Sequence, residues 1–365
     1  GLILGFGAMR LPTCSDDADV DMDAAVELMR LAFDSGVNYV DTAYPYHGGN
    51  SEVAVGRALA DGYRQRVLLA TKLPIWQVER LDDCRRIFDH QLSRLQTDRV
   101  DCYLLHCLQQ SSWPKMRDLG VLGWAESLQA EGLIGEFGFS FHETYEAFTE
   151  IVDACDWSFC QIQYNLVNED VQAGTRGLEY AAARGLSIVV MEPLFGGTLA
   201  NPPQPIQQIW NAADRHFRPP DLALRWLWNH PQVSLVLSGM STLGQVRENL
   251  ASANHAGAAW LDEEEAAVIR RVQEKYEELS PIPCTKCGYC LPCPNGINIP
   301  QNFELYNHAT LFKGSSVLLC RNLYHGLPEH ERAAACEQCG TCEARCPQHI
   351  DIGNLMQRVA EEFGA

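Results

Sequence analysis

The sequence predicts a parallel eight-stranded α/β barrel of the (β/α)8 class, followed by a small helical module rich in cysteine. Eight short apolar segments alternate with eight helical segments, polar residues stand at the ends of successive strands, and nine of the 15 cysteines follow residue 283. Strands that alternate with helices form parallel sheets with right-handed crossovers. A count of eight favours a closed barrel over an open sheet.

The strand segments are rich in β-branched and aromatic residues, and the helical segments carry apolar residues at helical spacing. The predicted strands are residues 3–9, 37–40, 66–72, 101–106, 135–140, 159–163, 186–191 and 233–237. The predicted helices are residues 24–35, one that begins at 51, 81–95, one that ends at 130 after a loop over 107–118, 145–154, 170–184, 220–229 and 243–253.

A charged helix over residues 262–279 leads out of the predicted barrel, and the Ser-Pro-Ile-Pro segment at 280–283 marks the expected boundary. The sequence therefore predicts two domains, residues 1–280 and 281–365. Apolar helical segments around residues 299–311 and 352–363 make the second domain α-helical.

Composition narrows the class of protein. The formal net charge of −19 argues against nucleic acid as a partner. No run of 18 apolar residues occurs, so we expect no membrane span, and no signal peptide is visible. We therefore expect a cytoplasmic protein, in which clustered cysteines indicate metal binding and not a framework of disulfides.

Polar side chains end three successive strands. Asp41 ends one strand, Tyr46 follows five residues later in the next loop, and Lys72 and His106 end the next two strands. Because the carboxyl ends of barrel strands open on one face, we expect these four residues to form one site.

The motifs that carry these residues, D-T-A-x-x-Y followed by S-E, then T-K-L-P and L-L-H, resemble those of the aldo-keto reductase superfamily over most of residues 1–260. The resemblance implies a TIM barrel and an NAD(P)-dependent oxidoreductase that interconverts a carbonyl and an alcohol, with Asp41, Tyr46, Lys72 and His106 as its catalytic tetrad. Tyr46 would act as general acid or base, Lys72 would lower its pKa, Asp41 would orient Lys72, and His106 would hold the carbonyl oxygen.

A nucleotide site is expected where residues 235–249 read LVLSGMSTLGQVREN, because a Gly-Ser-Thr turn that opens a helix attracts anions. The resemblance implies which residues contact each part of the nucleotide. Ser241 and Thr242 would contact the 2′-phosphate, and Glu248 and Asn249 the adenine. Ser140 and Gln161 would contact the carboxamide, and Met191 would cover the face of the nicotinamide. Gly239 and Gln245 replace basic residues of many members, which predicts weak discrimination between NADP and NAD.

Two cysteine runs fill the second domain. Residues 284–293 read CTKCGYCLPC, and residues 336–346 read CEQCGTCEARC with a proline next. The second run has the C-x₂-C-x₂-C-x₃-C-P spacing of bacterial ferredoxins, in which three cysteines bind one [4Fe–4S] cluster and the fourth binds the other. Zinc ribbons use two separated pairs instead. The predicted ligands are Cys284, Cys287, Cys290 and Cys346 for one cluster, and Cys336, Cys339, Cys342 and Cys293 for the other.

The whole chain thus resembles the branch of aldo-keto reductases that carries a ferredoxin-like C-terminal domain. The first function to expect is oxidoreduction of a small-molecule carbonyl or alcohol, coupled to iron–sulfur electron transfer, with a ferredoxin or another electron-transfer protein as candidate partner. An electron-transfer protein that uses the barrel as a docking body would reduce its clusters without consuming substrate. An enzyme that retains its nicotinamide for elimination or epimerisation would turn over without net change in NAD(P)H.

Overall fold

The structure is a computed structural model that describes residues 3–213, 215, 217–256, 261–284, 288–311, 315–346 and 348–364. The chain divides into two compact units, Gly1–Leu194 with Pro220–Asp262, and Phe195–Pro219 with Glu263–Ala365. The domain boundary expected at residues 280–283 stays a prediction.

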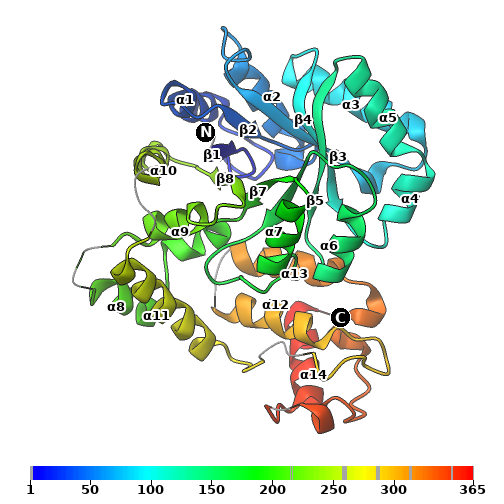
Figure 1. Ribbon diagram of the computed structural model, residues 1–365, viewed down its shortest axis with the longest axis vertical. Helices are drawn as coiled ribbons and strands as arrows, with labels where there is room; N and C mark the ends of the chain where they lie inside the picture. Colours follow the sequence, from blue (N-terminus) through cyan, green and yellow to red (C-terminus); the bar gives the residue numbers. More distant parts are fainter. Residues whose placement is uncertain are drawn as a thin grey trace. The chain divides into compact units, whose positions relative to one another are not determined.

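The first unit contains a closed barrel of eight parallel strands in sequence order, in which β8 pairs with β1. The strands, seen in Figure 1, are β1 (Leu4–Gly7), β2 (Tyr39–Asp41), β3 (Leu68–Pro74), β4 (Val100–Leu108), β5 (Ile134–Phe141), β6 (Phe159–Gln163), β7 (Ser187–Met191) and β8 (Val233–Gly239). The predicted (β/α)8 fold class is confirmed.

Helices follow the strands along the chain. They are α1 (Met22–Asp34), α2 (Asn50–Leu59), α3 (Leu81–Leu95), α4 (Trp113–Asp118), α5 (Val121–Ala130), α6 (Tyr145–Val152), α7 (Gly174–Ala183), α9 (Pro219–Trp228) and α10 (Leu243–Ala256). Helix α4 lies in a stretch expected to be a loop. Its buried residues Trp113 and Met116 span a single turn, which is too short a segment for helical periodicity to be recognised.

The barrel interior is filled by a layer of apolar side chains. Its members are Tyr39, Ala70, Cys102, Leu104, Phe159, Val189, Leu235 and Leu237. Side chains alternate between the two faces of a strand, so residues two positions further along point to the same interior. Those residues include Asp41, Lys72, His106, Gln161 and Met191. The apolar layer closes the barrel below, and a polar layer lies above it at the carboxyl ends of the strands.

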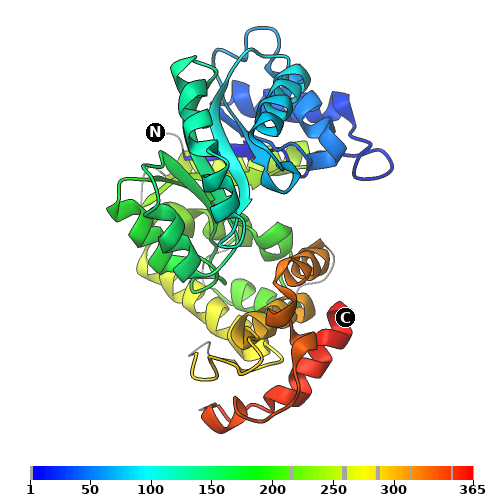
Figure 2. The same ribbon diagram turned by 90° about the vertical axis from the view of Figure 1, so that its right-hand side faces the viewer.

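The second unit is helical. Its helices are α8 (Gln204–Asn211), α11 (Glu263–Leu279), α12 (Ile299–Leu311), α13 (Ser315–Gly326) and α14 (Ile352–Phe363), and α12 packs against both α13 and α14 (Figures 1 and 2). Helix α13 was not expected from the sequence, because Cys320 and Tyr324 are its main buried residues and give only a weak periodic signal.

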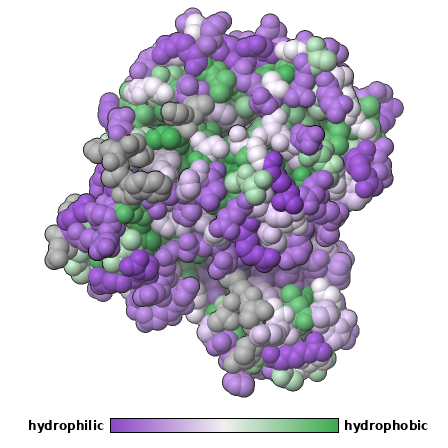
Figure 3. Space-filling model, in the orientation of Figure 1, coloured by the Kyte–Doolittle hydropathy of each residue, from purple (hydrophilic) through white to green (hydrophobic). Residues whose placement is uncertain are grey.

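Hydrophilic residues dominate the face shown in Figure 3, with smaller apolar areas between them. Within the described ranges, every helix is too short or too polar to cross a bilayer.

Candidate functional site

A buried ion pair stands at the centre of the polar layer. The Lys72 ammonium is 2.6 Å from Asp41 Oδ2 and donates to the Thr42 carbonyl at 2.8 Å. Lys72 is fully buried and Asp41 is 3% exposed. The Tyr46 hydroxyl lies 3.5 Å from the same Nζ, so the three predicted residues meet at one point.

The loop that carries Tyr46 is held in an uncommon backbone conformation. His47 has φ 51°, a value that few side chains adopt. Its ring is buried and held at both nitrogens, since Nε2 accepts from the Leu11 N–H at 3.2 Å and Nδ1 contacts the Asp17 carbonyl at 2.5 Å. Gly49 also has positive φ, and a Cβ there would lie 2.5 Å from the Arg94 guanidinium carbon.

Arg94 on α3 clamps this loop. Its Nη1 donates to the Tyr44 carbonyl and to Glu52 Oε2, both at 3.1 Å, and its guanidinium covers the Tyr44 ring at 4.4 Å. Glu52 is completely buried, and its other oxygen accepts from Gln91 Nε2 at 2.9 Å.

The same network reaches the strand that carries Lys72. The Gln91 amide contacts the Lys72 carbonyl at 3.0 Å and Thr71 Oγ1 at 3.1 Å, and Thr71 donates to Glu52 at 2.8 Å. Tyr103 donates to the Gln91 side-chain oxygen at 2.7 Å. The Tyr46 loop and the Lys72 strand are therefore tied together through Glu52 and Gln91.

His106 completes the group. Its ring meets the Tyr46 ring edge-on with centroids 5.8 Å apart. Burial, then the charge of Lys72 and the neighbouring His142, hold the pKa of His106 well below its usual value. The imidazole is therefore neutral near pH 7, and its Nδ1 has no partner in the described part of the chain.

The electrostatics of Tyr46 differ from the sequence-based expectation. Burial, followed by the charges of Asp41, Cys107 and Glu192, raises the pKa of Tyr46 well above its usual value. The lowering expected from Lys72 is outweighed by burial of the phenol, which is the largest cause of the shift. Tyr46 is thus a protonated hydroxyl at neutral pH, which suits a proton donor.

The residues expected at the nicotinamide stand side by side on adjacent strands. Ser140 pairs with Gln161 in register, and Gln161 Nε2 lies 3.6 Å from Met191 Sδ. Ser140 Oγ accepts from the Cys107 N–H at 2.8 Å. Gln161 Oε1 is buried without a hydrogen-bond partner among the described residues, so the amide has an acceptor to offer a ligand.

The expected phosphate and adenine residues cluster where β8 leads into α10. Ser241 N–H donates to Gln245 Oε1 at 2.7 Å, and Gln245 N–H donates to Thr242 Oγ1 at 3.2 Å. The amide of Asn249 donates to Ser238 at 2.7 Å, and the Glu248 carbonyl accepts from Ser252 at 3.2 Å.

Arg10 adds a cation here that sequence reasoning missed. Ser241 Oγ donates to the Arg10 carbonyl at 2.7 Å, and a Cβ on Gly239 would meet the Arg10 side chain at 3.3 Å. Arg10 follows β1, far from Gly239 in sequence. Only the pairing of β1 with β8 in the closed barrel brings the two residues together.

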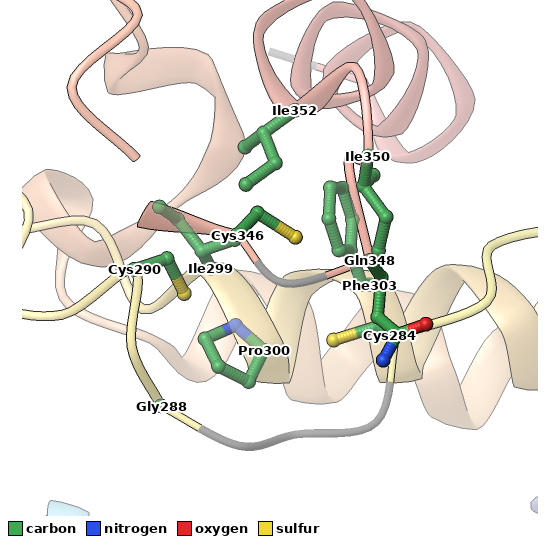
Figure 4. A pocket seen from close by; sticks show the side chains of 10 residues that line it. All are labelled: Cys284, Gly288, Cys290, Ile299, Pro300, Phe303, Cys346, Gln348, Ile350 and Ile352. Atoms are coloured by element: carbon green, nitrogen blue, oxygen red, sulfur yellow. The ribbon is translucent and has the colours of Figure 1, made fainter. Parts of the chain in front are cut away.

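One cavity of the second unit gathers cysteines from both runs. Cys284, Cys290 and Cys346 line this cavity, and Figure 4 shows their sulfur atoms directed toward it. Apolar residues complete the wall, among them Phe303 and Ile352. Cys287, the fourth predicted ligand, lies outside the described residues.

A second cavity is lined by Cys336, Cys339 and Cys342, and also by Cys293 from the first run. The Gln338 N–H donates to Cys336 Sγ at 3.4 Å. Each cavity thus takes one cysteine from the other run, in the arrangement that the ferredoxin spacing predicts.

The donor sets fit cubane clusters better than single ions. Among the described residues, no three cysteine, histidine or carboxylate side chains could share one metal ion. A [4Fe–4S] cube takes one thiolate at each of four irons, so its ligands stand apart around a cavity. The apolar walls would also exclude water from such a group.

Residues 3–274 match the family model for the aldo/keto reductase family. This chain belongs to the aldo/keto reductase family. Residues 283–350 match the 4Fe–4S dicluster domain, so this aldo/keto reductase carries an iron–sulfur domain after its barrel.

Proteins of known name are similar in sequence to the barrel part of this chain. An L-galactose dehydrogenase from Arabidopsis thaliana is 27% identical over 304 residues, covering 76% of this chain and 92% of its own. An NADH-specific methylglyoxal reductase from Escherichia coli strain K12 is 24% identical over 306 residues, covering 72% of this chain and 91% of its own.

Solved structures agree with this assignment. An aldo-keto reductase from Bacillus halodurans in its holo form has a TM-score of 0.62 and 26% identity, covering 74% of this chain and 91% of its own. An aldo/keto reductase from Klebsiella pneumoniae in complex with NADP and acetate has a TM-score of 0.59 and 27% identity, covering 74% of this chain and 90% of its own.

Three further polar groups of this aldo/keto reductase lie at the carboxyl ends of its barrel strands and were not singled out from the sequence. Cys107 follows His106, His142 follows β5, and Glu192 follows Met191. Both His142 Nδ1 and Glu192 Oε2 are buried atoms without a partner among the described residues. The signal that could have found Glu192 is the one that found Asp41, an acid at the end of an apolar strand.

Arg94→Met should lower the free energy of unfolding by about 1–3 kcal/mol, because Glu52 would keep a buried carboxylate oxygen without its donor. Urea unfolding followed by tryptophan fluorescence measures the change. Arg85→Met is the matched control, since Arg85 lies exposed on the same helix and pairs only with surface acids. Equal stability of the two variants would show that the clamp does not support the loop.

Proposed function

We propose that this aldo/keto reductase interconverts a carbonyl and an alcohol with Tyr46 as the proton donor to oxygen, and that its iron–sulfur domain exchanges electrons with a partner protein. The observation that supports the catalytic part most directly is the buried Lys72–Asp41 pair at 2.6 Å beside the Tyr46 hydroxyl.

Residues of the chain can bind and protonate the carbonyl oxygen of a substrate. Tyr46 keeps its proton at neutral pH, and Lys72 stands 3.5 Å behind it to stabilise the phenolate that remains after transfer. Asp41 holds the ammonium in place. Neutral His106 can donate a hydrogen bond that orients the carbonyl. A bound nicotinamide supplies the hydride.

The chain also offers residues suited to hold that nucleotide. Gln161 presents a buried acceptor that an N–H of the carboxamide would satisfy, and Ser140 lies opposite it in register. Met191 is placed to cover a ring face. The solved Klebsiella pneumoniae relative binds NADP, which makes this nucleotide the first to test.

Replacing Tyr46 by Phe should lower kcat for carbonyl reduction by about 10²-fold or more, because the ring stays and only the transferable proton is lost. Methylglyoxal with NADPH is a suitable first assay. Tyr63→Phe is the control, as Tyr63 is a hydroxyl bonded to Asp34 on the surface. More than a tenth of wild-type kcat in Tyr46→Phe would exclude Tyr46 as the acid.

Arg10 replaces the basic residues missing at Gly239 and Gln245, and we infer that it faces the 2′-phosphate. Arg10→Met should weaken NADPH binding by about tenfold or more while NADH binding changes less, since one charged contact is worth about 1.5–3 kcal/mol. Fluorescence titration of both nucleotides measures this. An equal loss for both nucleotides would place Arg10 elsewhere on the cofactor.

Two [4Fe–4S] clusters are the occupants we propose for the two cysteine cavities. The crossed lining, with Cys346 in one cavity and Cys293 in the other, supports the ferredoxin pattern of ligation. A nicotinamide transfers two electrons together and a cubane commonly transfers one, so the clusters would pass single electrons to a ferredoxin or a similar partner.

Cys293→Ser should remove the cluster built on Cys336, Cys339 and Cys342 and spare the other, lowering iron from about eight to about four per chain. Anaerobic iron analysis with EPR checks this, and Cys14→Ser, at an exposed thiol of the barrel, is the control. Loss of the cluster on Cys284 and Cys290 instead would mean that each run binds its own cluster.

A further inference from the structure

Glu192 is an acid at the end of β7 that the proposed reduction does not use. Asn165, itself fully buried, donates from its amide to the Glu192 carbonyl at 3.2 Å. The backbone of Glu192 has φ 55°, a left-handed conformation that costs a side-chain-bearing residue energy. Strain of this kind gathers at functional sites, because the surrounding structure must hold it.

The side chain of Glu192 acts on the tetrad. Its charge is one of those that raise the pKa of Tyr46, after burial and Asp41. The same charge also raises the pKa of the Cys107 thiol, which burial raises as well. Oε2 is shielded from solvent and has no hydrogen-bond partner among the described residues. A buried acceptor without a partner is rare in native proteins and points to a group that a ligand completes.

The carboxyl group is also suited to exchange protons near neutral pH. Burial raises the pKa of Glu192 to about 7, against the opposing charge of Arg10. The charged or titratable groups that face it are Arg10 after β1, Tyr46 after β2 and Cys107 in β4. A base with a pKa near the working pH is the most effective general base.

We propose that Glu192 is a second acid–base residue of this site, which takes the proton from the carbon next to the carbonyl of a bound ketone, so that the site enolises the ketones it binds. The inference rests on the proposed role of Tyr46 and His106 in holding the carbonyl oxygen. The carboxylate breaks the C–H bond and gains the proton, while the electron pair moves to the carbonyl oxygen as an enolate.

Tyr46 and His106 stabilise that enolate by hydrogen bonds, with the Lys72 ammonium behind Tyr46. Return of a proton from Glu192 regenerates the ketone, so the step consumes no oxidant or reductant. Because Asp41 and Glu192 are both acidic, the substrate class is an uncharged ketone with a C–H next to its carbonyl. Hydroxyacetone fits this description and serves as the probe.

The experiment follows loss of the α-proton signals of hydroxyacetone by NMR in D₂O, with the full iron-loaded chain and without nucleotide. We expect exchange above the buffer blank, with a rate that rises with pH and a midpoint near 7, because the carboxylate form is the base. Glu192→Gln should lower the rate by about 10²-fold. Glu136→Gln, an exposed acid near the amino end of β5, should exchange like wild type.

Glu192→Asp keeps a carboxyl one methylene further back, and we expect an exchange rate between those of wild type and Glu192→Gln. This variant and the wild-type pH profile decide the matter if Glu192→Gln fails to fold, as circular dichroism would show. Exchange that persists in Glu192→Gln overturns the proposal. So does an exchange rate equal to the blank in a wild-type protein that reduces hydroxyacetone with NADPH. Loss of both reduction and exchange would instead overturn the carbonyl-binding role of Tyr46.

Discussion

The ammonium of Lys72 inside the barrel is the constraint on which the rest of the site depends. Removing a charge from water costs several kcal/mol, and the cost is offset only if the charge is paired and hydrogen-bonded. Asp41 and the Thr42 carbonyl meet that need, so β2 and β3 must end at matching heights. Burial raises the pKa of Asp41, and the neighbouring Lys72 opposes that shift.

That charge is tolerated because an apolar layer lies directly below it and a hydrogen-bonded network lies behind it. The layer from Tyr39 to Leu237 closes the barrel to water. Glu52 and Gln91 then connect the strand of Lys72 to Arg94 and so to the loop of Tyr46. The geometry of the barrel mouth beside Lys72 thus depends on side chains from α2 and α3.

The barrel and the grouping of Asp41, Lys72 and His106 at its mouth could be predicted from the sequence because each rests on a local pattern. Asp41, Lys72 and His106 are the last inward residues of their strands, and a period of two places them on one face. Arg10 could not be assigned in this way, because its surroundings come from a strand distant in sequence. The direction of the Tyr46 pKa shift was misjudged for a related reason: the sequence places an ammonium beside the phenol but does not show how deeply the phenol is buried. Helix α13 was not predicted because few of its side chains are buried.

The crossed lining of the two cysteine cavities links cluster assembly to the order of protein synthesis. Cys346 lies in the cavity of the first run and Cys293 in that of the second. Under the proposed ligation, the set that includes Cys336, Cys339 and Cys342 is complete once the chain has been made through residue 342, and the set that includes Cys284 and Cys290 only once it has been made through residue 346. Most of the iron–sulfur domain would thus be synthesised before either proposed cluster could bind its fourth cysteine, and a chain cut short between the runs would lack a complete ligand set for either one.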